Sequence, residues 1–256
     1  VEIPTLPDGL SALLSSVSDC IGLQDTPPGS DGLLRKRMEG DLESFSDALK
    51  AKGYFKAEVA ARLDTSSTPR TVSFLIEPGP RFEFDKPVLD LVSDDSAREH
   101  LRDVVSRIRA GDKYSSGTVL DVETALLERL KEHGHPSPAV GERKVIADHS
   151  TQKVQVRFVI DPGPKAKFGS TEILGLEDVS QEVVTSALTW KEGSPYDRRQ
   201  IDTTREQLIR TGLFRSVRIN ADHPKDAGTV TMRLTLLEAP HRSIRAGLWF
   251  YSDLGL

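Results

Sequence analysis

The sequence is poor in cysteine, methionine and aromatic residues. It has 256 residues with 1 cysteine and 2 methionines, and Phe, Trp and Tyr together make up 6%. Because Cys20 is the single cysteine, no internal disulfide can form, so an oxidising compartment is neither required nor excluded. Val17, Ile21 and Leu23 lie close to Cys20 in the sequence, which favours a small buried hydrophobic residue over a reactive thiol.

Long hydrophobic runs are missing as well. No stretch resembles a transmembrane helix or a signal peptide. The sequence starts at Val1 without an initiator methionine, so we expect a mature or excised fragment. Charged residues make up 29% and hydrophobic residues 37%, the ordinary balance of a globular chain. The net charge of −5 gives no general attraction to nucleic acid or anionic lipid.

What the sequence does have is a threefold repeat. Gly53, Gly134 and Gly212 each follow a long amphipathic segment and lie about 80 residues apart. In the first two copies a Pro-Gly-Pro junction comes next, at 78–80 and 162–164. Proline stops a preceding strand, so these junctions mark module boundaries. The repeat predicts three tandem modules and a short final segment, with the bounds 1–80, 81–164, 165–240 and 241–256.

Each copy shows the same expected order of strand, helix, helix, strand, strand. Apolar residues recur at three- and four-residue spacings over 118–133, which is typical of a helix. They alternate over 229–237, which is typical of a strand. The glycine after the second helix fits a left-handed C-cap, and Asp178 is the expected N-cap of a helix at 179–190. Other helices are expected at 97–108 and 198–211, and other strands at 57–63, 71–77, 81–91, 166–174 and 216–220.

This order predicts an α+β fold in which two helices cover one face of a three-stranded mixed sheet in every module. The third strand of each module is the most apolar and is expected in the centre of its sheet. The second strand is then an open edge, at 56–63, 139–147 and 215–221. The first copy leaves room for an opening strand within residues 1–6 at most, so we expect a shortened module there.

The final segment differs from the modules. Four apolar residues alternate with other residues over about the length of a transmembrane β-strand, and they are Ile244, Ala246, Leu248 and Phe250. No hairpin partner follows before Leu256. Because an apolar strand is poorly stable unpaired, we expect 243–254 to pair with another sheet edge.

The order of elements, the repeated glycine turn and the Pro-Gly-Pro junctions resemble polypeptide-transport-associated (POTRA) domains. Segments 113–134, 193–197 and 211–217 resemble the link between helices, the second helix and the entry to the second strand of such domains. Segment 247–255 resembles the first barrel strand of the bacterial outer-membrane assembly superfamily. Three modules ahead of such a strand are most similar to the TamA-like members of the BamA/TamA superfamily.

The resemblance implies the periplasmic region of a Gram-negative outer-membrane protein that inserts or translocates other outer-membrane proteins, autotransporters included. It implies an inner-membrane-anchored TamB-like partner, unfolded client polypeptides and no cofactor. It also implies that the four apolar residues of the final strand face lipid. A BamA-type insertase, a two-partner secretion transporter and a purely structural periplasmic scaffold stay open as alternatives. The length of the full protein separates the barrel-bearing alternatives from the scaffold.

Catalytic and metal-binding constellations are not predicted. His133, His135 and Glu132 fall in the turn after a helix, and no further ligands are evident nearby. The glycine-rich segment 111–117 does not have the order of a phosphate loop. Glu238 lacks a partner at catalytic spacing, and no serine lies in a nucleophile elbow. We therefore expect a protein that is not an enzyme and that holds no metal or cofactor.

The chemistry that remains is that of the main chain at a sheet edge. An extended client segment can pair with unpaired N–H and C=O groups without a fixed sequence. The alternative is that the edges are merely short and twisted enough to resist aggregation. The candidate client-binding residues are Val59, Ala61, Leu63, Val217 and Ile219.

Overall fold

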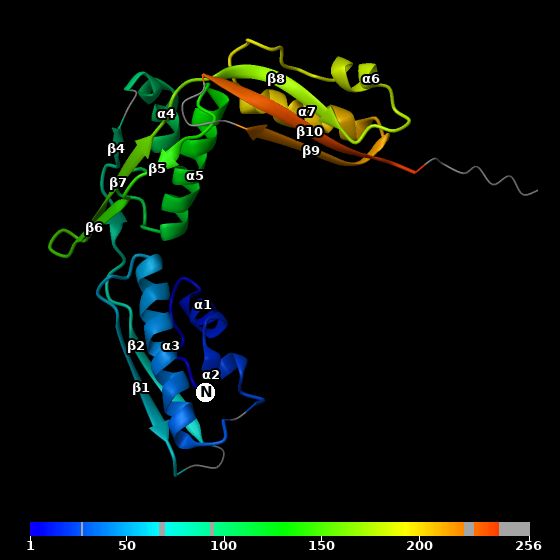
Figure 1. Ribbon diagram of the computed structural model, residues 1–256. Coiled ribbons are helices and arrows are strands. Elements are labelled where there is room, and N and C mark those ends of the chain that lie inside the picture. Colours follow the sequence, from blue (N-terminus) through cyan, green and yellow to red (C-terminus); the bar gives the residue numbers. More distant parts are fainter. Residues whose placement is uncertain (27, 67–69, 93–94, 223–227, 241–256) are drawn as a thin grey trace, which may run out of the picture. The chain divides into compact units, whose positions relative to one another are not determined.

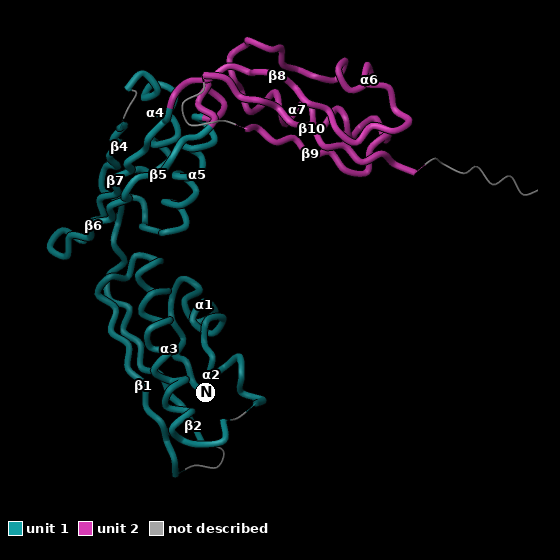
Figure 2. The backbone as a smooth tube through the Cα atoms, viewed as in Figure 1, with its two compact units in different colours: residues 1–130, 137–163 teal, residues 131–136, 164–256 magenta. Residues whose placement is uncertain are grey.

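A computed structural model describes residues 1–26, 28–66, 70–92, 95–222 and 228–240. The chain divides into two compact units, residues 1–130 with 137–163, and residues 131–136 with 164–256 (Figure 2). Among the described residues, no helix combines the length and the apolar character needed to cross a bilayer. The predicted lipid-facing residues Ile244, Ala246, Leu248 and Phe250 lie outside the described residues.

The first sheet is small and lies against a long helix (Figure 1). Its strands are antiparallel, and Glu2 extends the sheet by one parallel bridge to Ser73. The Glu2 N–H donates to the Val72 carbonyl at 2.9 Å, and the Phe74 N–H donates to the Glu2 carbonyl at 3.0 Å. The opening strand expected within 1–6 is thus reduced to a single residue. The elements are α1 (Leu10–Ser16), α2 (Asp19–Gly22), α3 (Asp31–Ala51), β1 (Glu58–Asp64) and β2 (Thr71–Glu77).

A buried carboxylate joins the start of α2 to α3. Asp41, which is 1% exposed, accepts hydrogen bonds from the Ser18 hydroxyl at 2.6 Å and from the N–H groups of Asp19 and Cys20 at 2.7 and 3.1 Å. Burial first, and the Asp41 carboxylate second, raise the pKa of the Cys20 thiol to about 12. Cys20 is buried, as predicted, and is not a reactive thiol at neutral pH.

The second sheet is built around one central strand, β7 (Lys153–Asp161). β3 and β4 pair with β7 in parallel, and β5 and β6 pair with it antiparallel. The single strand expected at 81–91 is split at Pro87, because proline has no N–H to donate to the sheet. The other elements are β3 (Glu83–Phe84), β4 (Val88–Leu91), the 3₁₀ turn Asp95–Ala97, α4 (Arg98–Val105), α5 (Ser116–Glu132), β5 (Ala139–Val140) and β6 (Lys144–Asp148).

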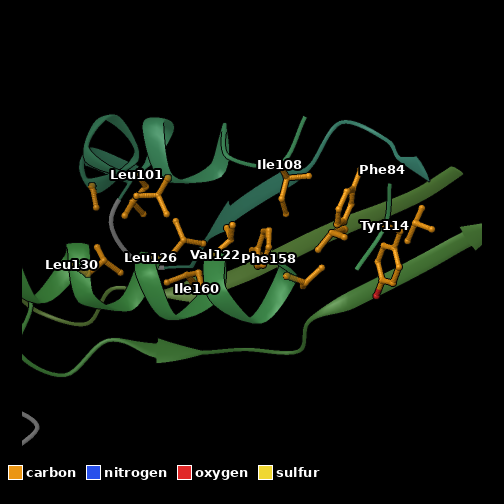
Figure 3. Close-up of a cluster of buried hydrophobic side chains, with 14 of the residues drawn as sticks. Phe84, Leu101, Ile108, Tyr114, Val122, Leu126, Leu130, Phe158 and Ile160 are labelled. Carbon is orange, nitrogen blue, oxygen red and sulfur yellow. The ribbon is translucent and has the colours of Figure 1, made fainter. Parts of the chain in front are cut away.

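The core of the second sheet follows the helical spacing that the sequence shows. Val122, Leu126 and Leu130 project from α5 toward Phe158 and Ile160 of β7 (Figure 3). All five side chains are buried. Burying an aliphatic side chain stabilises a fold by about 2 kcal/mol, so this stripe fixes which face of α5 meets the sheet.

The third sheet has the strand order β8, β10, β9. β8 runs parallel and β9 antiparallel to β10, so the sheet is mixed and the third strand is central, as predicted. Val184 from α6 and Ile201 and Leu208 from α7 pack against β10, which confirms two helices on one face. The elements are β8 (Lys167–Leu174), α6 (Gln181–Ser186), α7 (Arg198–Arg210), β9 (Phe214–Asp222) and β10 (Thr229–Glu238).

Helix α6 is shorter than the expected 179–190, and its N-cap is Ser180; the prediction of Asp178 was wrong. The Asp178 N–H donates instead to the Glu238 carboxylate. At the other end, the Thr189 N–H donates to the Thr204 hydroxyl at 3.0 Å, which takes that residue out of the helical ladder. Both changes come from partners far along the chain.

A glycine with left-handed backbone links helix α3 to the second sheet. Gly53 has φ of 93°, as the predicted C-cap requires, and its carbonyl accepts the Phe82 N–H at 2.8 Å. The Phe82 carbonyl in turn accepts the Tyr114 N–H at 3.0 Å. The rings of Phe55 and Phe82 lie 5.3 Å apart, and those of Phe55 and Tyr114 5.2 Å. We call these contacts the glycine joint.

The second unit contains the same arrangement. Gly134 has φ of 97°, and its carbonyl accepts the Ala166 N–H at 3.0 Å. The Ala166 carbonyl accepts the Tyr196 N–H at 3.0 Å. The repeat in the sequence is therefore also a repeat of main-chain hydrogen bonds.

The predicted α+β class is confirmed. The described residues hold three sheets and three separate hydrophobic clusters. The bounds 1–80, 81–164, 165–240 and 241–256 stay a prediction.

Candidate functional site

The third sheet leaves β9 as an open edge. β9 pairs with β10 over almost its whole length, and within the described residues its other side pairs with no strand. Val217 lies opposite Leu236 and Ile219 opposite Leu234, so both side chains face the helices. Val217 is half-buried and Ile219 is buried, and both pack in the core of the third sheet.

The first sheet leaves β1 as an open edge in the same way. β1 pairs with β2 alone in the part of the chain that the structure describes. Val59, Ala61 and Leu63 are half-buried and pack against the core beneath α3. All five candidate residues thus lie on open edges, but their side chains contact their own cores. The groups that these edges leave accessible to a client are therefore the N–H and C=O groups of the main chain. Client binding by the five residues stays a prediction.

The second sheet has a broken edge made of β5 and β6. Between Val140, opposite Ile160, and Lys144, opposite Arg157, the edge has one residue more than β7 has. This is a β-bulge, a feature that re-aims an edge strand. The Gly141 N–H donates to the Val159 carbonyl at 2.8 Å, and a Cβ at Gly141 would lie 2.9 Å from the Val159 side chain. Glycine therefore allows the close approach at the bulge.

The broken edge carries three exposed apolar residues that the sequence did not single out. They are Val140 on β5 and Val145 and Ile146 on β6. The alternation used to choose candidates on β1 and β9 is absent over 139–147, because the bulge shifts the alternation by one residue. An interruption of the alternating pattern within an expected edge strand is therefore the sequence signal that would have identified these three residues.

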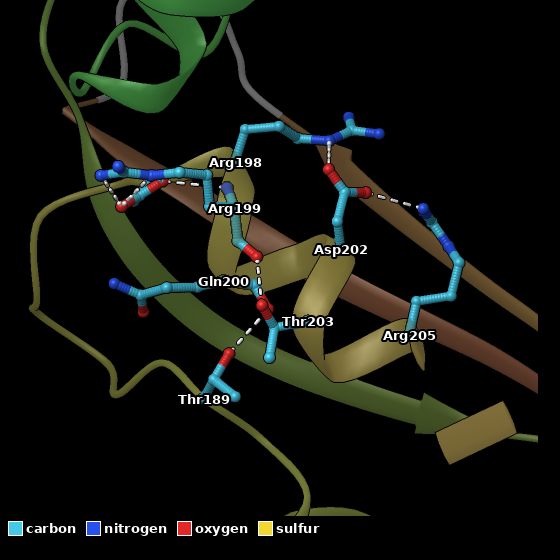
Figure 4. A network of polar contacts seen from close by, with 8 residues as sticks. Thr189, Arg198, Arg199, Gln200, Asp202, Thr203 and Arg205 are labelled. Carbon is cyan, nitrogen blue, oxygen red and sulfur yellow. Dashed lines mark hydrogen bonds and ion pairs between the residues drawn. The ribbon is translucent and has the colours of Figure 1, made fainter. Parts of the chain in front are cut away.

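One polar cluster of the second unit consists of ion pairs between residues of α7 and its N-cap. Asp202 accepts from Arg198 at 3.2 Å and from Arg205 at 2.8 Å (Figure 4). The N-cap Asp197 accepts from the Arg199 N–H and guanidinium. Burial opposes ionisation of Asp197, but the bonds from Arg199 outweigh it, so the pKa of this carboxyl lies below its usual value.

Glu238 has a structural role at the end of β10. Its carboxylate accepts hydrogen bonds from the backbone N–H groups of Glu177, Asp178 and Val179, at 2.9 to 3.2 Å. Three consecutive N–H groups converging on a carboxylate form an anion-binding nest. The contact ties the last residue of the central strand to the loop between β8 and α6.

The histidines at the end of α5 lie in the segment that leads to β5. His135 occupies a buried position, and the described residues contain no group of three His, Cys, Asp or Glu side chains able to hold a metal ion. His135 takes the place that buried Tyr54 has after Gly53, so the turn keeps a buried side chain there, an imidazole in place of a phenol.

Comparisons with known proteins agree with this geometry. The POTRA family model, described as a surface antigen variable number repeat, matches residues 166–238. The chain is 23% identical over 230 residues to the outer membrane protein assembly factor BamA of Neisseria meningitidis serogroup B. That alignment covers 86% of this chain and 28% of the Neisseria protein, so the chain spans less than a third of its relative.

Two solved structures share the fold. The crystal structure of POTRA3-5 of Haemophilus influenzae BamA superposes with a TM-score of 0.57 at 21% identity, covering 79% of this chain and 80% of that one. The crystal structure of BamA from Haemophilus ducreyi lacking POTRA domains 1-3 superposes with a TM-score of 0.54 at 16% identity. The match covers 62% of this chain and 30% of that one. The mixed sheet with two helices on one face is thus the POTRA fold.

Proposed function

Because residues 166–238 form a POTRA domain of the BamA/Omp85 superfamily, we propose that this chain is the periplasmic region of an outer-membrane protein assembly or translocation factor. It binds unfolded client polypeptides by adding them as strands to its open sheet edges. It catalyses no reaction. The name of the Neisseria relative, an outer membrane protein assembly factor, supports the proposal.

The observation that carries the proposal is the position of the edge strands. β1 and β9 each pair on one side within the described residues, which leaves a row of N–H and C=O groups for a client. Each main-chain hydrogen bond contributes about 1 kcal/mol net, so pairing over a few residues is weak and reversible. Weak pairing suits a protein that passes its client onward.

We also propose three POTRA modules, at 1–80, 81–164 and 165–240, ahead of a barrel strand at 241–256. The buried residues of the three hydrophobic clusters support the division, because each cluster falls within one proposed module. The similarity to three consecutive POTRA domains of the Haemophilus protein supports it as well.

The finer proposal is a TamA-like protein that docks to an inner-membrane-anchored TamB-like partner. The number of modules ahead of the expected barrel strand supports it. A BamA-type insertase is the second candidate, and the Neisseria relative favours it. Affinity purification of the tagged full-length protein from its own membranes separates the two. A TamA-like protein retains a large inner-membrane-anchored partner, and recovery without such a partner contradicts the finer proposal.

Depletion of the full-length protein tests the general proposal. In the bacterium that encodes it, we expect depletion to lower a set of β-barrel proteins several-fold in isolated outer membranes, measured by quantitative mass spectrometry. A wild-type copy restores these levels, and a copy that lacks residues 1–240 does not. Unchanged levels of all barrel proteins on depletion would contradict the proposal.

A further inference from the structure

Aromatic rings and an ion pair fill the glycine joint of the first unit. The half-buried ring of Phe55 lies 5.3 Å from the ring of Phe82 and 5.2 Å from that of Tyr114. Phe82 itself is completely buried. In the residues next to Phe82 and Tyr114, the Lys113 Nζ lies 2.8 Å from the Glu83 carboxylate. Rings and ion pair together close the space around this joint.

Main-chain contacts identify the equivalent residues around Gly134 in the second unit. In the first unit the Phe82 carbonyl accepts the Tyr114 N–H at 3.0 Å. In the second unit the Ala166 carbonyl accepts the Tyr196 N–H at the same distance. Ala166 therefore takes the place of Phe82, and Tyr196 takes the place of Tyr114.

Isolated antiparallel bridges extend this equivalence by one residue. They join Glu83 to Lys113 in the first unit and Lys167 to Pro195 in the second. The position of the carboxylate in the first unit thus holds a lysine in the second, and the position of the lysine holds a proline. The ion pair of the first unit has no equivalent across this bridge, because one of its two positions carries no charge.

Both phenylalanine rings are also missing from the second copy. Ala166 stands where Phe82 stands, so one ring is reduced to a methyl group. Pro136 follows Gly134 at the same spacing at which Phe55 follows its own glycine, so the second ring is replaced by a pyrrolidine. The space that two phenylalanines fill in the first copy has no aromatic ring to fill it in the second.

A pocket of about 570 Å³ opens at this place. Its lining includes Gly134, Ala166, Lys167 and Tyr196, which are the equivalents of residues of the glycine joint. All of its lining residues belong to the second unit. The volume lies in the range of sites for small ligands. The pocket therefore has the size and the position of a site from which rings have been removed.

Among the charged residues of the pocket, one lysine is left for a ligand. Lys165 and Lys167 both line the pocket, and Lys167 forms no ion pair within the described residues. The acidic lining residues are Asp197 and Glu132. The hydrogen bond to Asp197, and more weakly the Glu132 carboxylate, raise the pKa of the Arg199 guanidinium. Both carboxylates are thus balanced in part by Arg199, and the Lys167 ammonium stays available for an anion.

We propose that this pocket binds an aromatic ring that carries a carboxylate on a short arm. The ring takes the place of the missing phenylalanines and packs against Tyr196, since aromatic pairs are favourable. The carboxylate pairs with Lys167, as Glu83 pairs with Lys113 in the first copy. A free aromatic acid and an aromatic side chain beside an acidic residue of a polypeptide present this same chemistry. The site is separate from the open edges of β1 and β9, so the proposed function does not depend on it.

Amide NMR spectra of the whole 256-residue chain test the site. One probe is phenylpropionate, and the other is an end-blocked peptide in which phenylalanine precedes aspartate. We expect saturable shifts at the amides of Ala166, Lys167 and Tyr196, and the probe that binds more tightly identifies the source of the ligand. If neither probe shifts these amides saturably, the inference is overturned and the proposed function stands.

Two matched compounds separate the contributions of the ring and the charge. Phenylpropionamide keeps the ring and loses the charge, and propionate keeps the charge and loses the ring. We expect each to bind at least about tenfold more weakly than phenylpropionate, because each lacks one of the two contacts. Equal binding of phenylpropionate and its amide overturns the assignment of a carboxylate, and equal binding of propionate overturns that of a ring.

Three variants of the chain locate the site. Ala166→Phe restores the ring that Phe82 supplies in the first copy and should abolish binding by filling the pocket. Lys167→Glu should weaken binding at least about tenfold, and Lys36→Glu, on the exposed side of α3, should change it less than about twofold. Both lysines are exposed, so the melting temperatures of these two variants should match that of the unchanged chain. Equal weakening by both lysine variants contradicts the site. If Ala166→Phe unfolds, the comparison of the lysine variants decides.

Discussion

At the scale of single residues, two described carboxylates connect segments that are distant in the sequence. Asp41 joins α3 to the turn that precedes α2, and Glu238 joins the end of β10 to the loop before α6. Neither contact follows from local sequence, because each partner lies more than twenty residues away. Such groups have large effects when removed, because their buried partners then lose hydrogen bonds.

Replacing the buried carboxylate should loosen the first helices. Asp41→Ala leaves the Ser18 hydroxyl and two N–H groups without their acceptor, so we expect the free energy of unfolding to fall by about 3 kcal/mol. Urea denaturation measures it. Cys20 should also begin to react with a thiol reagent at pH 8, where the unchanged chain does not. Asp47→Ala removes an exposed ion pair and should change stability by less than about 0.5 kcal/mol. Equal effects of the two variants would refute the role of Asp41.

The N-cap residue of α7, Asp197, should make the stability of the fold depend on pH in the acidic range. The pKa of Asp197 in the folded chain lies below the value of about 3.9 that an unfolded chain has, so its ionised form stabilises the fold above that pH. This contribution is complete above about pH 4 and is lost as the pH falls further toward the folded pKa. Asp197→Asn keeps an N-cap but loses the ion pair with Arg199.

Urea unfolding at several pH values measures this contribution. We expect Asp197→Asn to be less stable than the unchanged chain at pH 7, and the difference to shrink as the pH falls below 4. A difference that stays constant down to pH 2 would contradict the assignment.

At the scale of elements, the glycine joint fixes how a helix end meets the next sheet. Gly53 has φ of 93°, and a Cβ there would lie 3.1 Å from the Tyr114 carbonyl oxygen and 3.3 Å from that of Phe82. Arg81, just after the Pro-Gly-Pro junction, donates to the Lys52 carbonyl at 2.9 Å and lies over the Tyr54 ring. Main-chain hydrogen bonds and the Arg81 side chain thus both fix the end of α3 next to the start of the second sheet.

Two alanine substitutions separate backbone strain from steric exclusion at this joint. Gly53 and Gly111 have nearly equal positive φ, 93° and 95°, but a Cβ at Gly111 meets no atom within 4 Å. Both variants incur a backbone cost of about 1 kcal/mol. Gly53→Ala should lose about 2 kcal/mol more, because it pushes on main-chain atoms that are hydrogen-bonded. Denaturant titration of both variants measures the difference, and equal losses would show that the joint tolerates a side chain.

Local patterns in the sequence predict the elements that are regular. β2 has the expected bounds, and α7 and β10 differ from expectation by one residue each. The strand is split at Pro87, a residue that the sequence shows, whereas the early end of α6 depends on Thr204, a partner that no local pattern reveals. The apolar edge at Val145 was missed because the bulge hides its alternation. Helices α1 and α2 were missed because each is too short to show a helical period.

At the scale of the whole molecule, stability is divided among separate cores. Phe158 lies in the cluster beneath α5 in the first unit, and Leu234 lies in the cluster beneath α7 in the second. Both side chains are completely buried. Within the described ranges, no buried residue belongs to more than one of the three clusters, so we expect each core to respond to its own substitutions.

Calorimetry of two core variants tests this division. Phe158→Ala and Leu234→Ala should each cost about 3 to 4 kcal/mol, because each leaves a cavity. We expect each variant to lower the temperature of one calorimetric transition and leave another in place. A single transition that both variants lower equally would mean that the cores unfold as one.

The glycine joint bears on how such a chain arises. Its hydrogen bonds join main-chain groups: the Phe82 N–H donates to the Gly53 carbonyl, and the Ala166 N–H donates to the Gly134 carbonyl. The same geometry holds although Tyr54 follows one glycine and His135 the other. A gene segment that is duplicated in frame therefore brings its own attachment point, since the carbonyl and the N–H travel with any sequence. Arrays of different length can then arise by copying or deleting whole segments, without new side chains evolving at each junction.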